Sequence, residues 1–66
     1  MTSHPLTREI YTVDAIDAGI IAFAGTCTAT AQHAPEQTLL SVDAPDDVLA
    51  ELLNYILATS AHELLA

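Results

Sequence analysis

The sequence contains no lysine, no tryptophan and a single arginine, Arg8, against nine acidic residues, so its formal net charge is −8. Affinity for nucleic-acid phosphates comes mainly from Lys and Arg, and one arginine cannot make a basic surface. An anionic membrane surface repels the same charge. The composition therefore argues against nucleic acid and membranes as partners.

Glycine, cysteine and clustered histidine are also scarce. With Gly19 and Gly25 as its only glycines, the chain has no glycine-rich phosphate loop. Cys27 is the only cysteine, so no internal disulfide can form, which agrees with a reducing compartment. No metal site is expected, because no ligand spacing links the histidines to Cys27 or to one another: His4, His33 and His62.

No segment points to catalysis, secretion or membrane insertion. Cys27 stands in an alternating strand pattern, where a small buried residue is expected rather than a nucleophile. Met1 to Pro5 is polar and does not resemble a secretory signal. The longest uncharged apolar stretch, Ala18 to Ala24, falls far short of the roughly 20 residues that span a bilayer. We predict a cytoplasmic, non-catalytic protein without cofactor, metal or catalytic residues.

What is present is apolar content: 52% of the 66 residues are hydrophobic, enough for one small domain over residues 1–66. A domain of this size buries only about 60% of the surface of its extended chain. Its stability should therefore be modest, or should depend on a partner.

The amino-terminal half predicts a strand followed by a helix. Residues 6–11 alternate between apolar and polar side chains after Pro5, as a half-buried strand does. Thr12 is placed as the N-cap of a helix over residues 13–24. Gly25 then follows as a left-handed C-cap.

The second half predicts a hairpin and a longer helix. Alternation over residues 26–31 indicates a strand, residues 32–36 a loop, and residues 37–42 a second strand. A turn then leads into a helix over residues 46–63. At 100° per residue, its apolar residues fall within an arc of roughly 140°, which predicts that they form most of the core: Leu49, Leu52, Leu53, Ile56, Leu57 and Leu64.

The order strand, helix, strand, strand, helix predicts an α+β fold. Its three-stranded antiparallel sheet has the order 1-3-2 and two helices on one face, like a ferredoxin-like unit that lacks its last strand. The first strand then has an open edge, where a peptide or a second copy could pair. Its charged residues could instead protect that edge. The partner-binding residues predicted from this edge and the neighbouring helix are Thr7, Arg8, Glu9, Ile10, Tyr11 and Ile21.

The acidity has two explanations that composition does not separate. An acidic surface poor in lysine is typical of organisms that accumulate salt, where salt screens the self-repulsion. The alternative is that the charge steers a basic protein surface or a cationic peptide towards the chain.

Several short motifs carry a resemblance to a known family. They are residues 6–11 with Val13-Asp14-Ala15-Ile16, then Ala22-Phe23, and Leu52-Leu53-Asn54-Tyr55 in the last helix. Over about residues 6–65 the chain resembles HxsD, the small protein of His-Xaa-Ser peptide-maturation systems. The resemblance implies an accessory protein that acts beside radical S-adenosylmethionine enzymes on a ribosomally made peptide. It supplies no catalytic residue.

We therefore expect an acidic adaptor that binds a peptide-modifying enzyme or its precursor peptide through an open edge strand. Homodimerisation through the same edge is a further possibility. The alternative from a different class is a regulatory module that dimerises and holds a small ligand between its subunits.

Overall fold

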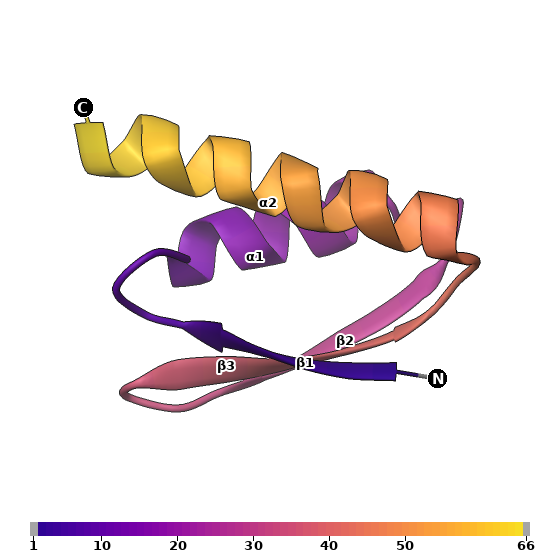
Figure 1. Cartoon of the computed structure of the whole chain (residues 1–66), viewed down its shortest axis with the longest axis horizontal. Coiled ribbons are helices and arrows are strands. Elements are labelled where there is room, and N and C mark those ends of the chain that lie inside the picture. The colour runs from indigo at the N-terminus through magenta and orange to yellow at the C-terminus, as the bar shows by residue number, and fades with distance from the viewer. Residues whose placement is uncertain (1, 66) are drawn as a thin grey trace.

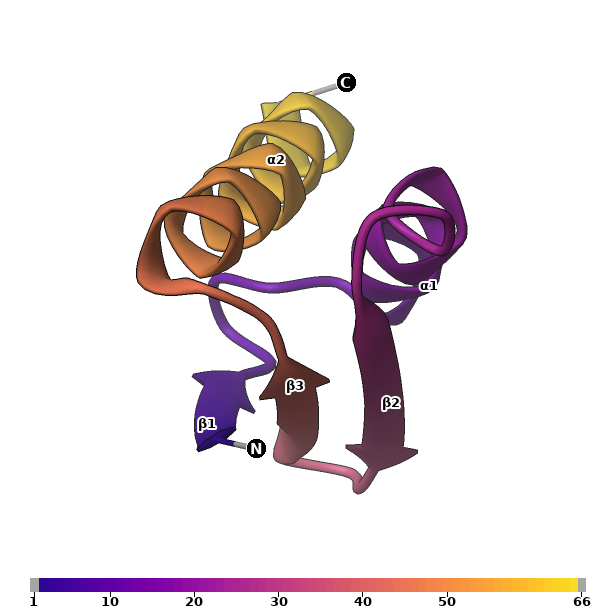
Figure 2. The same ribbon diagram turned by 90° about the vertical axis from the view of Figure 1, so that its right-hand side faces the viewer.

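The computed structural model describes residues 2–65 and has two layers (Figures 1 and 2). The elements follow the predicted order: β1 (Thr2–Thr7), α1 (Val13–Ala22), β2 (Thr28–His33), β3 (Gln37–Asp43) and α2 (Asp46–Leu65). The strands form an antiparallel sheet in the order β1-β3-β2. Figure 2 shows both helices on one face, with α1 above β2 and α2 above β1 and β3. The predicted fold class is confirmed.

The strand register sorts the side chains between the two faces of the sheet. In β3, Thr38, Leu40 and Val42 are buried, whereas the residues between them are more exposed. Opposite Leu40 stand His4 of β1 and Ala31 of β2, so these positions share the covered face. The other face has no helix over it and carries mainly hydroxyl and amide side chains around Leu39.

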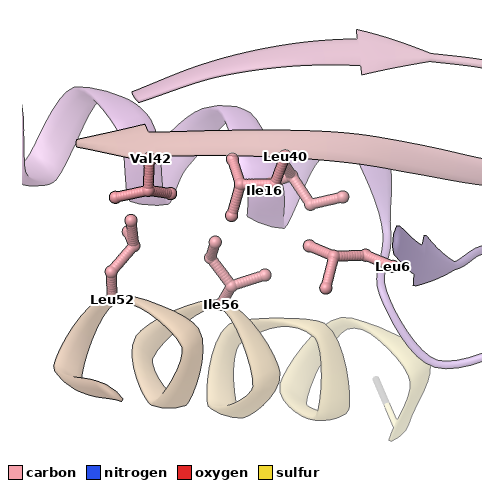
Figure 3. Packing of buried hydrophobic residues seen from close by; sticks show 6 residues of the cluster. All are labelled: Leu6, Ile16, Leu40, Val42, Leu52 and Ile56. Carbon is pink, nitrogen blue, oxygen red and sulfur yellow. The ribbon is translucent and has the colours of Figure 1, made fainter. Parts of the chain in front are cut away.

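The core lies between the sheet and the two helices. It consists of one residue from β1, one from α1, and two each from β3 and α2, shown in Figure 3: Leu6, Ile16, Leu40, Val42, Leu52 and Ile56. Gly19 lies where α1 meets α2, because a Cβ built there would stand 2.6 Å from Cγ1 of Ile56. The absence of a side chain at residue 19 therefore sets how closely the helices approach.

The first strand lies four residues nearer the amino terminus than predicted. It covers Thr2–Thr7, not residues 6–11, and Pro5 lies inside it opposite Leu39. The chain then turns, and the carbonyl of Thr7 accepts hydrogen bonds from the amides of Ile10, at 3.2 Å, and Tyr11, at 2.9 Å. The prediction began the strand after Pro5, where the apolar–polar alternation is clear, whereas the edge strand includes the proline, as edge strands can.

Helix α1 begins as predicted and ends earlier. The hydroxyl of Thr12 accepts a hydrogen bond from the amide of Ala15 at 3.1 Å, which confirms the N-cap. The helix ends at Ala22 with Phe23 as its C-cap, rather than at residue 24. The left-handed C-cap predicted at Gly25 is wrong, since no glycine of the described chain has a positive φ. Backbone hydrogen bonds from Thr26 and Cys27 to the Phe23 carbonyl close this turn instead.

The later elements match the predictions with small shifts. Strand β2 covers Thr28–His33 instead of residues 26–31, β3 extends one residue further than predicted, and α2 extends to Leu65. The predicted apolar arc of α2 is too wide, because Leu57 and Leu64 are 42% and 57% exposed. Within residues 2–65, no helix combines the length and apolar character needed to cross a bilayer.

Candidate strand-binding edges of the sheet

The sheet has two outer strands, and the hydrogen-bonding pattern shows which backbone groups each one leaves free. Residues opposite one another in antiparallel strands alternate between hydrogen-bonded and non-hydrogen-bonded pairs. The amide of Arg8 donates to the carbonyl of Glu36 at 2.9 Å, and the amide of Ala34 donates to that of Gln37 at 2.8 Å. These two bonds fix the alternation along β1–β3 and β2–β3.

By this alternation, the even-numbered residues of β1 bond to β3, while Ser3, Pro5 and Thr7 direct their backbone groups to the open edge. Proline has no N–H, and the Thr7 carbonyl is already bonded within the turn. Strand β1 therefore offers the amides of Ser3 and Thr7 and the carbonyls of Ser3 and Pro5. Its edge is partly blocked, as is common for edge strands in natural proteins.

The edge of β2 is more complete. Its even-numbered residues pair with β3, so Ala29, Ala31 and His33 direct both an N–H and a C=O outward. No described segment lies beyond this strand in the sheet. Strand β2 therefore has a row of free backbone N–H and C=O groups along its outer edge, and no proline interrupts this row.

A hollow of about 210 Å³ lies beside β2, beneath the carboxyl end of α1. It is lined mostly by apolar side chains: Ile20, Ala24, Cys27, Thr28 and Ala29. Ile21 is 76% exposed and stands one turn after Asp17, whose carboxylate binds His33 of β2. Since residues four apart share a flank of a helix, Ile21 lies on the flank of α1 that faces β2.

The six predicted partner-binding residues do not form one surface. Thr7 ends β1, and Glu9 and Ile10 are exposed in the turn after it, whereas Tyr11 packs against the core. Ile21 lies in the last turn of α1, at the opposite end of that helix from the turn after β1. The grouping of Ile21 with the first strand is therefore wrong.

Arg8 has an internal role instead of guarding the edge. Its Nη2 donates to the carbonyls of Ala34, at 2.8 Å, and Gln37, at 3.2 Å, and to the hydroxyl of Thr38 at 2.8 Å. Backbone carbonyls of the β2–β3 loop and of the first residue of β3 thus hold the only arginine of the chain.

A chain of hydrogen bonds continues from Arg8 to α1. Nδ1 of His33 lies 2.8 Å from the Thr38 hydroxyl, and Nε2 of His33 lies 2.9 Å from Oδ1 of Asp17. A neutral His33 satisfies every partner if Nε2–H donates to Asp17 and Nδ1 accepts from Thr38, which in turn accepts from Arg8.

The order carboxylate, imidazole, hydroxyl resembles that of a hydrolytic triad. Thr38, however, is 0% exposed, so its hydroxyl is closed to a substrate in this structure. The hydrogen bonds join α1 to the hairpin and thereby position β2 and its edge. Within residues 2–65, no group of three or more His, Cys, Asp or Glu side chains is arranged to hold a metal ion.

Replacing Arg8 with Ala tests this structural role. It removes three hydrogen bonds from a charged donor, and we expect the free energy of unfolding to fall by about 1–3 kcal/mol. Urea unfolding followed by circular dichroism measures the change. Glu9→Ala, at an exposed neighbouring position, is the control and should alter stability by less than about 0.5 kcal/mol. Equal effects of the two substitutions would assign Arg8 to the solvated surface.

The β2 edge was not predicted from the sequence, because a missing fourth strand leaves the edge of the first strand open and draws attention to that strand alone. Two signals in the sequence point to β2 nevertheless. Pro5 lacks a backbone N–H, so the first strand is poorly suited to pair with an added strand. The side chains of Ala29 and Ala31 are small and leave space beneath α1. Comparison of the chain with protein-family models, curated proteins and solved structures finds no match.

Proposed function

We propose that this chain is a non-catalytic acidic adaptor that takes an extended basic segment of another protein as an added strand on β2. The unpaired ladder of Ala29, Ala31 and His33 beside an apolar hollow carries the proposal. Main-chain hydrogen bonds supply affinity in strand addition, and pockets for alternate side chains supply selectivity.

The hollow determines which side chains the added strand presents. Side chains alternate between the two faces of a strand, so every second residue of the segment faces the α1 side. There it meets the apolar lining of the hollow, which includes Ile20 of α1 and Ala29 of β2. The segment therefore has aliphatic residues at alternate positions and polar or basic residues between them.

Charge favours a basic segment. The formal net charge is −8, and the single arginine is bonded to the β2–β3 loop and Thr38. Asp14 and Asp17 of α1 are exposed, and the Asp17 carboxylate lies beside β2. Lysine or arginine in the segment reduces the self-repulsion of the acidic chain and accelerates association.

The resemblance to HxsD supplies the kind of partner. On that basis the basic segment belongs to a radical S-adenosylmethionine enzyme or to the peptide that this enzyme modifies. We place the adaptor in the cytoplasm, in keeping with its unpaired Cys27. Pull-down from the native host, with the captured proteins identified by mass spectrometry, tests this assignment separately from strand addition.

The edge itself is tested with a synthetic hexapeptide of alternating valine and lysine, and its counterpart with glutamate in place of lysine. We expect the lysine peptide to bind and to slow hydrogen exchange at the outward amides of β2, those of Ala29, Ala31 and His33. The glutamate peptide should bind at least about tenfold more weakly, a difference of about 1.4 kcal/mol. Calorimetry gives the affinities, and nuclear magnetic resonance identifies the protected amides.

Proline substitutions provide a matched pair. Ala31→Pro removes an outward N–H from β2, as Pro5 does in β1, without removing a bond to β3. It should reduce affinity for the lysine peptide by at least about tenfold. Ser3→Pro makes the same change on the edge of β1 and should leave binding unaltered. The proposal fails if Ser3→Pro removes binding while folded Ala31→Pro retains it, or if neither peptide binds.

A further inference from the structure

The side of α1 that lies over β2 changes in character from one end of the strand to the other. Asp17, in the second turn of the helix, binds His33 at the end of β2, with Oδ1 2.9 Å from Nε2. Further along the chain, Ile20 of α1 and Ala24 just after it line the hollow with Ala29, near the start of β2. The surroundings of the β2 edge are therefore acidic at its His33 end and apolar at its Ala29 end.

The carboxylate of Asp17 can bind a cation besides His33. The bond to His33 uses Oδ1, and an ionised carboxylate has about four acceptor sites over its two oxygens. The Asp17 side chain is 52% exposed, and the exposed Asp14 lies one turn earlier on a neighbouring position of the helix surface. Arg8 does not pair with Asp17, because Thr38 and His33 stand between them in the chain of hydrogen bonds.

Strand geometry determines which residues of an added strand meet these two ends. Ala29, Ala31 and His33 direct their backbone groups outward, and in an antiparallel pair each exchanges both bonds with the residue opposite it. Opposite residues have their side chains on the same face, so these three partners point towards α1. The partners of Ala29 and His33 lie about 13 Å apart, at about 3.3 Å per residue. Each end of the edge therefore acts on a different side chain of the segment.

We propose that the segment runs antiparallel to β2 and reads, from its amino end, basic, polar, aliphatic, polar, aliphatic. The inference rests on the proposed function and adds the order and direction of the segment. The basic residue lies opposite His33 and binds Asp17, and the last aliphatic residue lies opposite Ala29 and fills the hollow. Both existing strand pairs are antiparallel, and antiparallel pairing is slightly more stable per residue than parallel pairing.

The two ends together select against the reverse order of side chains. In the same antiparallel direction, a reversed segment places its basic residue over the hollow, where the lining is mostly apolar and burial of a charge is unfavourable. Its aliphatic residue then lies beside the half-exposed carboxylate of Asp17 instead of in the hollow. Specificity is a difference of affinities, and both ends contribute to it here.

Two pentapeptides with acetylated and amidated ends test the order. They are Lys-Thr-Val-Thr-Val and its reverse, Val-Thr-Val-Thr-Lys, which have the same composition and charge. We expect the first to bind at least about fivefold more tightly, because the reverse loses both end contacts. Titration followed by nuclear magnetic resonance gives the affinities. Equal binding would overturn the order while strand addition on β2 stands, whereas failure of both peptides to bind would remove strand addition and this inference together.

A nitroxide label on Lys-Thr-Val-Thr-Val reports the direction independently of affinity. Attached to the amino end of the peptide, it should broaden the amide signals of His33 and Ala34 more than those of Cys27 and Thr28. Attached to the carboxyl end, it should have the opposite effect. The converse pattern would show that the segment runs parallel to β2 and would overturn the proposed direction.

Asp17→Asn tests the acidic end with the hydrogen bond to His33 retained, since the amide oxygen of asparagine still accepts from Nε2. It should weaken binding of Lys-Thr-Val-Thr-Val at least about twofold and leave unchanged a peptide with norleucine in place of lysine. Glu51→Gln removes the same charge from an exposed position of α2 and is the control, with no change expected. Equal losses in the two variants would assign the attraction to net charge and contradict the role of Asp17.

Discussion

Replacing Leu52 with alanine is expected to lower the free energy of unfolding by about 2–5 kcal/mol. Leu52 is a fully buried member of the core cluster, and its Cδ1 lies 3.4 Å from the position of a Cβ at Gly19. The substitution removes buried methyl groups and leaves a cavity between α1, α2 and the sheet. At about 0.05–0.15 kcal/mol per residue, a chain of this length has roughly 3–10 kcal/mol of stability in total. One deletion in the core therefore removes a large part of it.

Urea unfolding followed by circular dichroism, at one protein concentration for all variants, measures this change. The midpoint should fall with little change in the slope. Ile21→Ala, at a residue 76% exposed, is the control and should change stability by less than about 0.5 kcal/mol. An unaltered midpoint for Leu52→Ala would contradict the packing in Figure 3.

Periodicity predicted the order of the elements, the order of the elements predicted the sheet topology, and the capping and turn residues predicted the start of both helices. The alternation of Ala29 and Ala31 with hydroxyl residues, and the buried positions of α2, are strong local signals. These signals predict the elements correctly because each strand or helix buries one face. Its apolar side chains must therefore recur with the period of a strand or of a helix. Helix α1 is equally clear at its start, where a hydroxyl side chain caps the first turn.

The same periodicity could not rank the leucines of α2. Leu52, Leu53 and Leu57 share the predicted arc, yet they are buried, half-buried and exposed. The difference depends on where α1 and the sheet lie around the helix, which is a property of the assembled fold. The close approach at Gly19 turns Ile56 and Leu52 inward and leaves Leu57 on the outer flank.

Strand edges were the least predictable feature for a related reason. Whether β1 or β2 can pair with another strand depends on which alternate residues of that strand are hydrogen-bonded to β3. A shift of the strand by a few residues changes which residues lie on the outer edge and which amides point outward. Placing the first strand at residues 6–11 removed Pro5 from the edge and made that edge look fully open. With the strand at Thr2–Thr7, the proline becomes part of the edge, and β2 is the better acceptor.

The two glycines should respond to alanine in opposite directions. A Cβ at Gly25 would meet no atom within 4 Å, and its φ is not positive, so Gly25→Ala should stabilise the chain by about 0.4–1 kcal/mol through the unfolded state. At Gly19 the Cβ would stand 2.6 Å from Cγ1 of Ile56, which is fully buried. Overpacking of this kind costs about 1–3 kcal/mol, more than the roughly 0.5–1 kcal/mol that alanine gains in a helix.

A double-mutant cycle assigns the cost at Gly19 to this contact. Ile56→Ala alone removes buried methyl groups and should lower stability by about 2–5 kcal/mol. In Gly19→Ala/Ile56→Ala the new methyl group meets no Cγ1 and partly fills the cavity. The loss should then be smaller than the sum of the two single losses, by a coupling of at least about 1 kcal/mol. Additive losses, or a stable Gly19→Ala, would mean that α1 and α2 lie further apart than this structure places them.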